Sequence, residues 1–100
     1  MSREEVVEKG AKWHVYIVRC RNGTLYTGVT TDLTRRVDEH NEGRGAKYTR
    51  ANGPVELVYS EVARGHGEAL RRERAIKRLR REKKLELILA GIIWSVLLSL

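Results

Sequence analysis

Two short apolar runs with a turn signal between them dominate the first third of the chain. Residues 14–20 and 24–29 are rich in β-branched and aromatic side chains, and Asn22-Gly23 separates them. Glycine accepts the positive φ angle that tight hairpin turns need, so the pattern predicts a β-hairpin. Each run contains one tyrosine, Tyr16 in the first and Tyr26 in the second.

The length of the turn decides whether the two tyrosines share a face of the sheet. A two-residue turn pairs Tyr16 with Val29 and places the tyrosines on opposite faces. A three-residue turn with Gly23 in a left-handed bulge pairs Tyr16 with Gly28 instead. Tyr16 and Tyr26 are then diagonal neighbours on one face, about 7–8 Å apart. Turn chemistry alone leaves both registers open.

The hairpin is followed by the pattern of a helix. Thr31 or Asp32 can cap its start, because their short side chains accept hydrogen bonds from the amides of the first turn. Gly43 is predicted to end it. Leu33 and Val37 mark the face that turns inward.

Two polar residues fall on the same inward face as Leu33 and Val37. They are Arg36 and His40, three and seven positions after Leu33, where a core helix would place apolar side chains. Polar groups on a buried face indicate a role beyond packing.

A basic loop and a third strand are predicted next. Residues 43–54 read as a mobile loop that suits a phosphate backbone, with a solvated connector as an equal alternative. Residues 55–63 lie between two glycine-containing stretches and predict a strand. The three strands give a small antiparallel or mixed sheet in an α+β fold.

A second helical period begins at Glu68. Glu73 falls within its inward stripe, where an ionised carboxylate is costly unless it is paired or coordinated. The alternative is an exposed pair with Lys77, one turn later. Periodicity leaves both interpretations open. The apolar members of the stripe are Ala69, Leu70, Ile76 and Leu79.

The last third of the chain changes from basic to apolar. Residues 80–84 are predicted to turn or break the helix, and Leu85 begins a new segment. Residues 87–100 carry no charge but are fewer than the roughly 20 that span a membrane, so no stable span is expected. They predict a final core helix with an apolar tail, or a surface for a protein partner, a second copy or a membrane face.

Composition and charge narrow the class of protein. The chain has 100 residues, enough for one small domain, with a net charge of +7. The segment 64–84 alone carries this excess, which favours a polyanionic partner such as nucleic acid. Cys20 is the single cysteine, which excludes an intrachain disulfide and fits a reducing cytoplasm. Residues 1–12 are charged, lack a secretory signal and read as a flexible lead-in.

The ordered set of motifs resembles the GIY-YIG nuclease superfamily. Val15-Tyr16 is followed by Tyr26-Thr27-Gly28, Arg36, His40 and Glu73. The match is similar to short stand-alone bacterial members and to the catalytic module of the bacterial excision-repair incision subunit. It covers residues 13–88 and leaves 89–100 as an apolar tail outside it. The resemblance implies a three-stranded antiparallel sheet flanked by helices, with both tyrosines facing one pocket, and therefore the bulged register.

The resemblance also implies an activity and a metal. The expected protein is a metal-dependent endonuclease that hydrolyses DNA phosphodiester bonds, such as those of branched or damaged DNA in DNA repair. Glu73 would be the ligand of Mg²⁺ or Mn²⁺, which acts as a Lewis acid. Arg36 would neutralise charge on the phosphoryl oxygens, for which its planar fork is suited.

The tyrosines would handle the attacking water. Tyr16 is the candidate general base, and Tyr26 would orient the water or the phosphate. A tyrosine with a pKa near ~10 is a poor base at neutral pH unless another group takes its proton. His40 and His14 are the candidates for that help. Taken singly, each of these residues also has a structural explanation, such as a core tyrosine or a satisfied histidine.

Backbone contacts are expected from the 43–54 loop and from the basic helix. Two departures from the family pattern support an alternative, a nucleic-acid-binding module of the same fold that is catalytically weak or inactive. Some relatives have lysine where this chain has Val29, and asparagine where it has Ala75. The residues expected to bind nucleic acid are Arg44, Lys47, Arg50, Arg71, Arg74, Lys77, Arg78 and Arg81.

Overall fold

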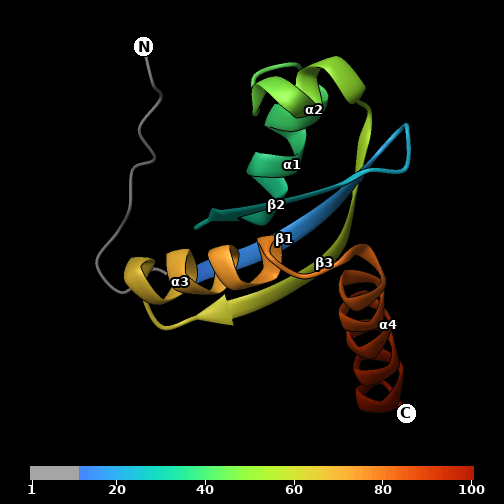
Figure 1. Cartoon of the computed structure of the whole chain (residues 1–100). Coiled ribbons are helices and arrows are strands. Elements are labelled where there is room, and N and C mark those ends of the chain that lie inside the picture. Colours follow the sequence, from blue (N-terminus) through green and yellow to red (C-terminus); the bar gives the residue numbers. More distant parts are fainter. Residues whose placement is uncertain (1–11) are drawn as a thin grey trace.

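The computed structural model describes residues 12–100, which form a three-stranded sheet with helices on both faces (Figure 1). The predicted lead-in lies outside the described residues except for Lys12. Strand β1 (Trp13–Cys20) is central, and both β2 (Leu25–Thr30) and β3 (Val55–Ala63) pair with it antiparallel. The expected α+β fold with an antiparallel sheet is confirmed. The helices are α1 (Leu33–Asn41), α2 (Lys47–Asn52), α3 (His66–Lys77) and α4 (Arg81–Leu98).

The β1–β2 hairpin adopts the bulged register. Tyr16 lies opposite Gly28, and Val18 lies opposite Tyr26. Gly23 has a φ of 87°, the left-handed conformation that glycine adopts without steric cost. Because residues two apart along a strand point to the same side, both tyrosines face the same side of the sheet.

One face of the sheet packs against α3. Val15 and Ile17 of β1 are fully buried there, together with Ala69 and Ile76 of α3. These four side chains form the larger apolar core, and alternation along β1 sends the intervening residues to the other face. Part of the predicted stripe of α3 is therefore correct.

The opposite face packs against α1. Tyr16 and Val18 are buried there with Val55 of β3, and Leu33 and Val37 of α1 cover them. Asp32 caps α1 by accepting a hydrogen bond from the backbone of its first turn, as predicted. In Figure 1, α1 and α2 lie on this side of the sheet and α3 lies on the other. Polar and apolar groups thus share the α1 face.

The predicted loop 43–54 contains a helix, so the expectation of a mobile loop is wrong. Helix α2 has six residues, too few to show a hydrophobic period, and its N-terminus has no side-chain cap. Tertiary contacts stabilise it instead. Thr49 is fully buried, and the carbonyl of Asn52 accepts a hydrogen bond of 3.0 Å from the backbone of Arg21 in the hairpin turn.

The break between the last two helices lies at residues 78–80, earlier than predicted. The basic residues from Arg81 onward form the first turn of α4, because arginine, lysine and glutamate all favour helix. Leu79 was predicted to face inward, but α3 ends before it at Lys77, and its side chain is 36% exposed. Charge density therefore does not break this helix.

Helix α4 packs on the sheet mainly through its first half. Leu87 and Ile88 contact the α3-side core, whereas Trp94 is 63% exposed and Leu98 is 80% exposed. The expected core helix followed by an apolar tail differs from this arrangement, because no residue of α4 is buried and the helix continues to Leu98, so the expected domain end at residue 88 falls within it. Among the helices of residues 12–100, none has the length and apolarity that a membrane crossing requires.

Candidate active site

Tyr16 and His40 are joined by a buried hydrogen bond. The Tyr16 hydroxyl lies 2.8 Å from Nε2 of His40, and each residue is 1% exposed. β1 supplies the tyrosine, and the last turn of α1 supplies the histidine. The inward position of His40 on α1, which its sequence spacing predicted, thus has a partner.

Tyr26 approaches the same histidine from β2. Its ring centroid lies 5.5 Å from that of His40, in an edge-on arrangement like that of Tyr16 and His40. His14 was the other histidine considered for Tyr16, but within the described part of the chain no hydrogen bond joins them. His40 is therefore the histidine on which both tyrosines converge.

Burial sets the protonation states of this pair. It raises the pKa of Tyr16 to about 12, and the hydrogen bond and positive charge of Arg36 offset part of the rise. The nearby charges of Tyr26 and Glu73 add to the rise. Burial, with a smaller effect from the Arg36 charge, lowers the pKa of His40 to about 4. At neutral pH a neutral phenol therefore faces a neutral imidazole.

Arg36 is held by a carboxylate that the sequence analysis did not single out. Its Nη1 donates a 3.0 Å hydrogen bond to Oε1 of Glu39, which is 4% exposed. Nε of Arg35 lies 3.9 Å from Oε2 of the same glutamate. The Arg36–Glu39 ion pair holds the guanidinium of Arg36 where it still affects the pKa of Tyr16. The i,i+3 spacing was the signal for this pair.

Glu73 lies on α3, the helix that packs on the other face of the sheet. Its side chain is only 17% exposed, and Oε2 lies 3.3 Å from Nζ of Lys77. Its charge nevertheless reaches Tyr16 and raises the pKa of the phenol. The alternative of an exposed pair is right about the partner, Lys77, but not about the exposure of Glu73, and metal coordination by this carboxylate stays a prediction.

Thr49 and Gly45 complete the surroundings of His40. Oγ1 of Thr49 lies 2.7 Å from Nδ1 of His40, and both groups are buried. A Cβ atom at Gly45 would overlap the His40 ring, so the loop before α2 passes close to it. No local pattern in the sequence predicts either contact, because α2 reaches His40 only through the tertiary fold.

The basic residues expected to contact nucleic acid are all exposed, but they occupy two layers of the fold. One group belongs to the α2 region and the other to α3 and the start of α4, on the opposite side of the sheet (Figure 1). Arg44 is paired with Glu42, and Lys77 with Glu73. The two groups therefore lie on opposite sides of the sheet and do not form one continuous basic surface along a single helix.

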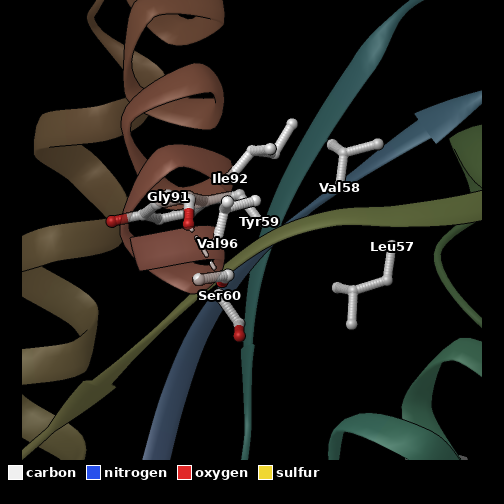
Figure 2. A pocket seen from close by; sticks show the side chains of 8 residues that line it. Leu57, Val58, Tyr59, Ser60, Gly91, Ile92 and Val96 are labelled. Atoms are coloured by element: carbon white, nitrogen blue, oxygen red, sulfur yellow. Dashed lines mark hydrogen bonds between the residues drawn. The ribbon is translucent and has the colours of Figure 1, made fainter. Parts of the chain in front are cut away.

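An apolar groove of about 350 Å³ lies elsewhere, between β3 and α4. Figure 2 shows Tyr59 of β3 beside Ile92 and Val96 of α4, with Leu57 farther along the strand and apart from the helix. Tyr59 pairs with Ile17 in the sheet, so this part of the groove is on the face opposite Tyr16. Its lining has no ionisable group other than a tyrosine, and its chemistry differs from that of the Tyr16–His40 cluster.

Comparison with protein-family models identifies the family to which the chain belongs. Residues 12–86 match the model of the GIY-YIG catalytic domain. The chain belongs to the GIY-YIG family. This membership places it in a nuclease superfamily, and it agrees with the resemblance drawn from the two tyrosine motifs.

Relatives of this GIY-YIG chain have been named without a specific activity. A UPF0213 protein of Staphylococcus saprophyticus is 50% identical over 80 residues, covering 80% of this chain and 98% of the relative. A UPF0213 protein of Desulfotalea psychrophila is 53% identical over 80 residues, covering 79% of this chain and 73% of the relative.

Solved structures of similar proteins share the GIY-YIG chain's fold. The NMR structure of a UPF0213 protein from Bacillus halodurans is 46% identical, with a TM-score of 0.52 over 80% of this chain and 86% of that one. An NMR structure from E. faecalis is 36% identical, with a TM-score of 0.56 over 82% and 88% of the two chains.

Proposed function

We propose that this GIY-YIG chain is a metal-dependent endonuclease that hydrolyses phosphodiester bonds in DNA, with branched or damaged DNA as its substrate. The observation that carries the proposal is the buried contact between the Tyr16 hydroxyl and Nε2 of His40. A phenol can serve as a general base only if a second group receives its proton, and His40 is such a group. Membership of a nuclease superfamily supports the same reaction class.

The carboxylate of Glu73 suits magnesium or manganese, ions that need few protein ligands, better than a metal that is bound by protein side chains alone. Within residues 12–100, no three or more histidine, cysteine, aspartate or glutamate side chains form a ligand cluster. Mg²⁺ commonly uses one or two carboxylates and completes its shell with water and substrate phosphate. Glu73 supplies such a carboxylate, largely buried and near Tyr16. When bound there, the ion would supply Lewis-acid stabilisation of charge on the phosphate.

Tyr16 and His40 would move the protons of the reaction. The Tyr16 oxygen would accept a proton from the attacking water while its own proton passes to Nε2 of His40. The water oxygen forms a bond to phosphorus, and the bond from phosphorus to the 3′ oxygen breaks with its electron pair staying on that oxygen, which takes a proton from solvent water. His40 is neutral at pH 7 because burial lowers its pKa to about 4, so its lone pair is available.

Arg36 and Tyr26 would position the reacting groups. The guanidinium of Arg36, held by Glu39 at 3.0 Å, can donate to non-bridging phosphate oxygens as negative charge develops on them. Tyr26 lies beside His40 and would orient the attacking water or the phosphate. The basic residues on both sides of the sheet would hold the DNA backbone by charge, without reading sequence.

Cleavage assays on labelled DNA test the proposal. Branched, nicked, duplex and single-stranded substrates are incubated with the chain in Mg²⁺ or Mn²⁺, and branched or damaged DNA is expected to be cut fastest. Glu73→Gln should abolish cleavage, and Tyr16→Phe should reduce it by about 10²- to 10⁴-fold. Tyr59→Phe is the matched control, because its hydroxyl contacts Glu61, and it should cleave normally.

Two results would contradict the nuclease proposal. One is the absence of cleavage of every DNA form by the unmodified chain at any metal concentration. The other is cleavage by the Glu73→Gln and Tyr16→Phe variants at the rate of the unmodified chain. Preference for RNA over all DNA forms would retain the reaction but replace the substrate.

A nucleic-acid-binding module with weak or no turnover is the second candidate. Two observations favour it: the pKa of Tyr16 is raised to about 12, which disfavours the phenolate, and Lys77 pairs with the carboxylate of Glu73. This candidate predicts DNA binding that weakens steeply with salt and persists in Glu73→Gln and Tyr16→Phe, without cleavage. Metal-dependent cleavage that both variants lose would exclude it.

A further inference from the structure

Thr49 contacts the ring nitrogen of His40 that Tyr16 does not. Its Oγ1 lies 2.7 Å from Nδ1, whereas the Tyr16 hydroxyl lies 2.8 Å from Nε2. Thr49 is fully buried on α2, the helix that the sequence did not predict. A single imidazole thus bridges a threonine from α2 and a tyrosine from β1.

The hydroxyl of Thr49 has its own acceptor. It donates a 2.9 Å hydrogen bond to the backbone carbonyl of Ala46. A hydroxyl carries one hydrogen, so Oγ1 is then an acceptor toward His40. The hydrogen of the neutral imidazole therefore lies on Nδ1, and Nε2 carries the lone pair.

The reverse assignment leaves a buried group without a partner. If Thr49 donated to Nδ1, Nε2 would carry the hydrogen and donate to the Tyr16 oxygen. Arg36, the other polar group that lowers the pKa of Tyr16, can only donate. The hydrogen of Tyr16, a residue 1% exposed, would then have no acceptor among the described residues. Stranding a buried donor is costly, so the first assignment is favoured.

Gly45 keeps the imidazole in register with both partners. A Cβ atom at position 45 would overlap Nδ1 and Cγ of His40, so glycine allows the chain to pass against the ring. His40 is therefore confined between the loop before α2, Thr49 and Tyr16.

We propose that Thr49 is a positioning residue that fixes His40 in the tautomer with hydrogen on Nδ1, so that the Nε2 lone pair faces the Tyr16 hydroxyl. Its role in catalysis rests on the proposed nuclease function, whereas the tautomer itself does not. Fixing the lone pair before substrate arrives removes a reorganisation step from proton transfer.

NMR of the full chain labelled with ¹⁵N-histidine measures the tautomer directly. Two-bond nitrogen–proton correlations distinguish protonated from unprotonated ring nitrogens, and the signals lost in His40→Gln identify this residue. The expected spectrum at pH 7 has hydrogen on Nδ1 and none on Nε2. It should be unchanged in Tyr16→Phe, because Oγ1 of Thr49 still accepts the hydrogen of Nδ1 in that variant.

Variants at position 49 provide the decisive comparison. Thr49→Val keeps the shape but removes the acceptor, and it should shift His40 toward the tautomer with hydrogen on Nε2. Thr49→Ser keeps the hydroxyl and should retain the original spectrum. An unmodified chain with hydrogen on Nε2 would overturn the proposal, as would a tautomer that Thr49→Val leaves unchanged. Amide spectra of each variant establish that it is folded.

Kinetics then separate this proposal from the nuclease proposal. With a DNA substrate that the chain cleaves, Thr49→Val should lower kcat by about 10- to 100-fold, the range known for partners that orient metal-bound histidines, with KM unchanged. Thr49→Ser should restore kcat. A loss expressed only in KM would contradict the positioning role. Absence of cleavage by the unmodified chain would contradict the nuclease function alone, and the NMR comparison would still decide the tautomer.

Discussion

Gly28 lies directly opposite Tyr16 in the β1–β2 pair, and a Cβ atom at position 28 would lie 2.5 Å from the Tyr16 hydroxyl. The missing side chain leaves the space that the phenol occupies on its way to His40. Glycine is therefore required at position 28, in the second tyrosine motif, because Tyr16 of the first motif occupies the space of a side chain there.

Replacing Gly28 by alanine should disturb this space. Gly28→Ala is expected to lower the free energy of unfolding by about 1–3 kcal/mol, the usual cost of overpacking a buried site. Urea denaturation measures the loss. Gly67→Ala is the control, because the nearest atom to a Cβ there is 3.5 Å away, on the flexible Arg71 side chain. Equal stability of Gly28→Ala and the unmodified chain would contradict this steric account.

His40 should make the folded chain less stable in mild acid. Its pKa is about 4 in the folded chain and near 6.5 when exposed, so between these values the unfolded chain binds more protons. Stability therefore falls as the pH drops from 6.5 toward 4, by on the order of 2–3 kcal/mol from this residue.

Comparing the unmodified chain with His40→Gln isolates this contribution. Urea denaturation at pH 7.5 and pH 4.5 gives both stabilities, and glutamine cannot take up the proton. The stability difference between the two chains should shrink at the lower pH, since only histidine loses stability by protonation. A difference that is the same at both pH values would show that His40 keeps an ordinary pKa.

Exposed arginines on α3 should contribute to DNA binding through charge. Arg74→Ala is expected to weaken binding to all DNA sequences similarly and to reduce the slope of log affinity against log salt by about 0.7–0.9. Fluorescence anisotropy between 50 and 200 mM salt, a range in which phosphate contacts weaken markedly, measures it. Arg19→Gln is the control, because Arg19 pairs with Glu56 at 2.9 Å, and its slope should not change.

The exposed half of α4 should be dispensable for the fold. A chain that ends after Leu89 keeps Leu87 and Ile88, which pack on the sheet, and loses residues that are mostly exposed. Its free energy of unfolding should change by about 1 kcal/mol or less. A much larger loss would mean that the groove between β3 and α4 stabilises the domain.

The same truncated chain tests the sequence-based expectation of self-association. Sedimentation velocity at several concentrations compares it with the full chain. A fall in apparent mass beyond that of the deleted residues supports association through residues 87–100. Equal association states remove that expectation, and flotation with lipid vesicles tests attachment to a membrane surface separately.

The sequence by itself determined the elements with regular patterns. Apolar runs bounded by glycine-containing stretches located all three strands, and the 3.6-residue period placed Arg36 and His40 on the inward face of α1. The order of the tyrosine motifs indicated the family, and through it the bulged register that Gly23 alone left open. These signals are local, because side-chain direction follows from position along a single element.

The tertiary structure alone decided how these elements meet. Helix α2 has only six residues, too few for a hydrophobic period to predict it. No sequence spacing links Thr49 to His40, because that contact depends on how the hairpin turn, α1 and α2 pack together. The reach of Glu73 from the far face of the sheet is equally nonlocal. Sequence patterns indicate which side of an element is buried, but packing between elements determines which residues contact that side.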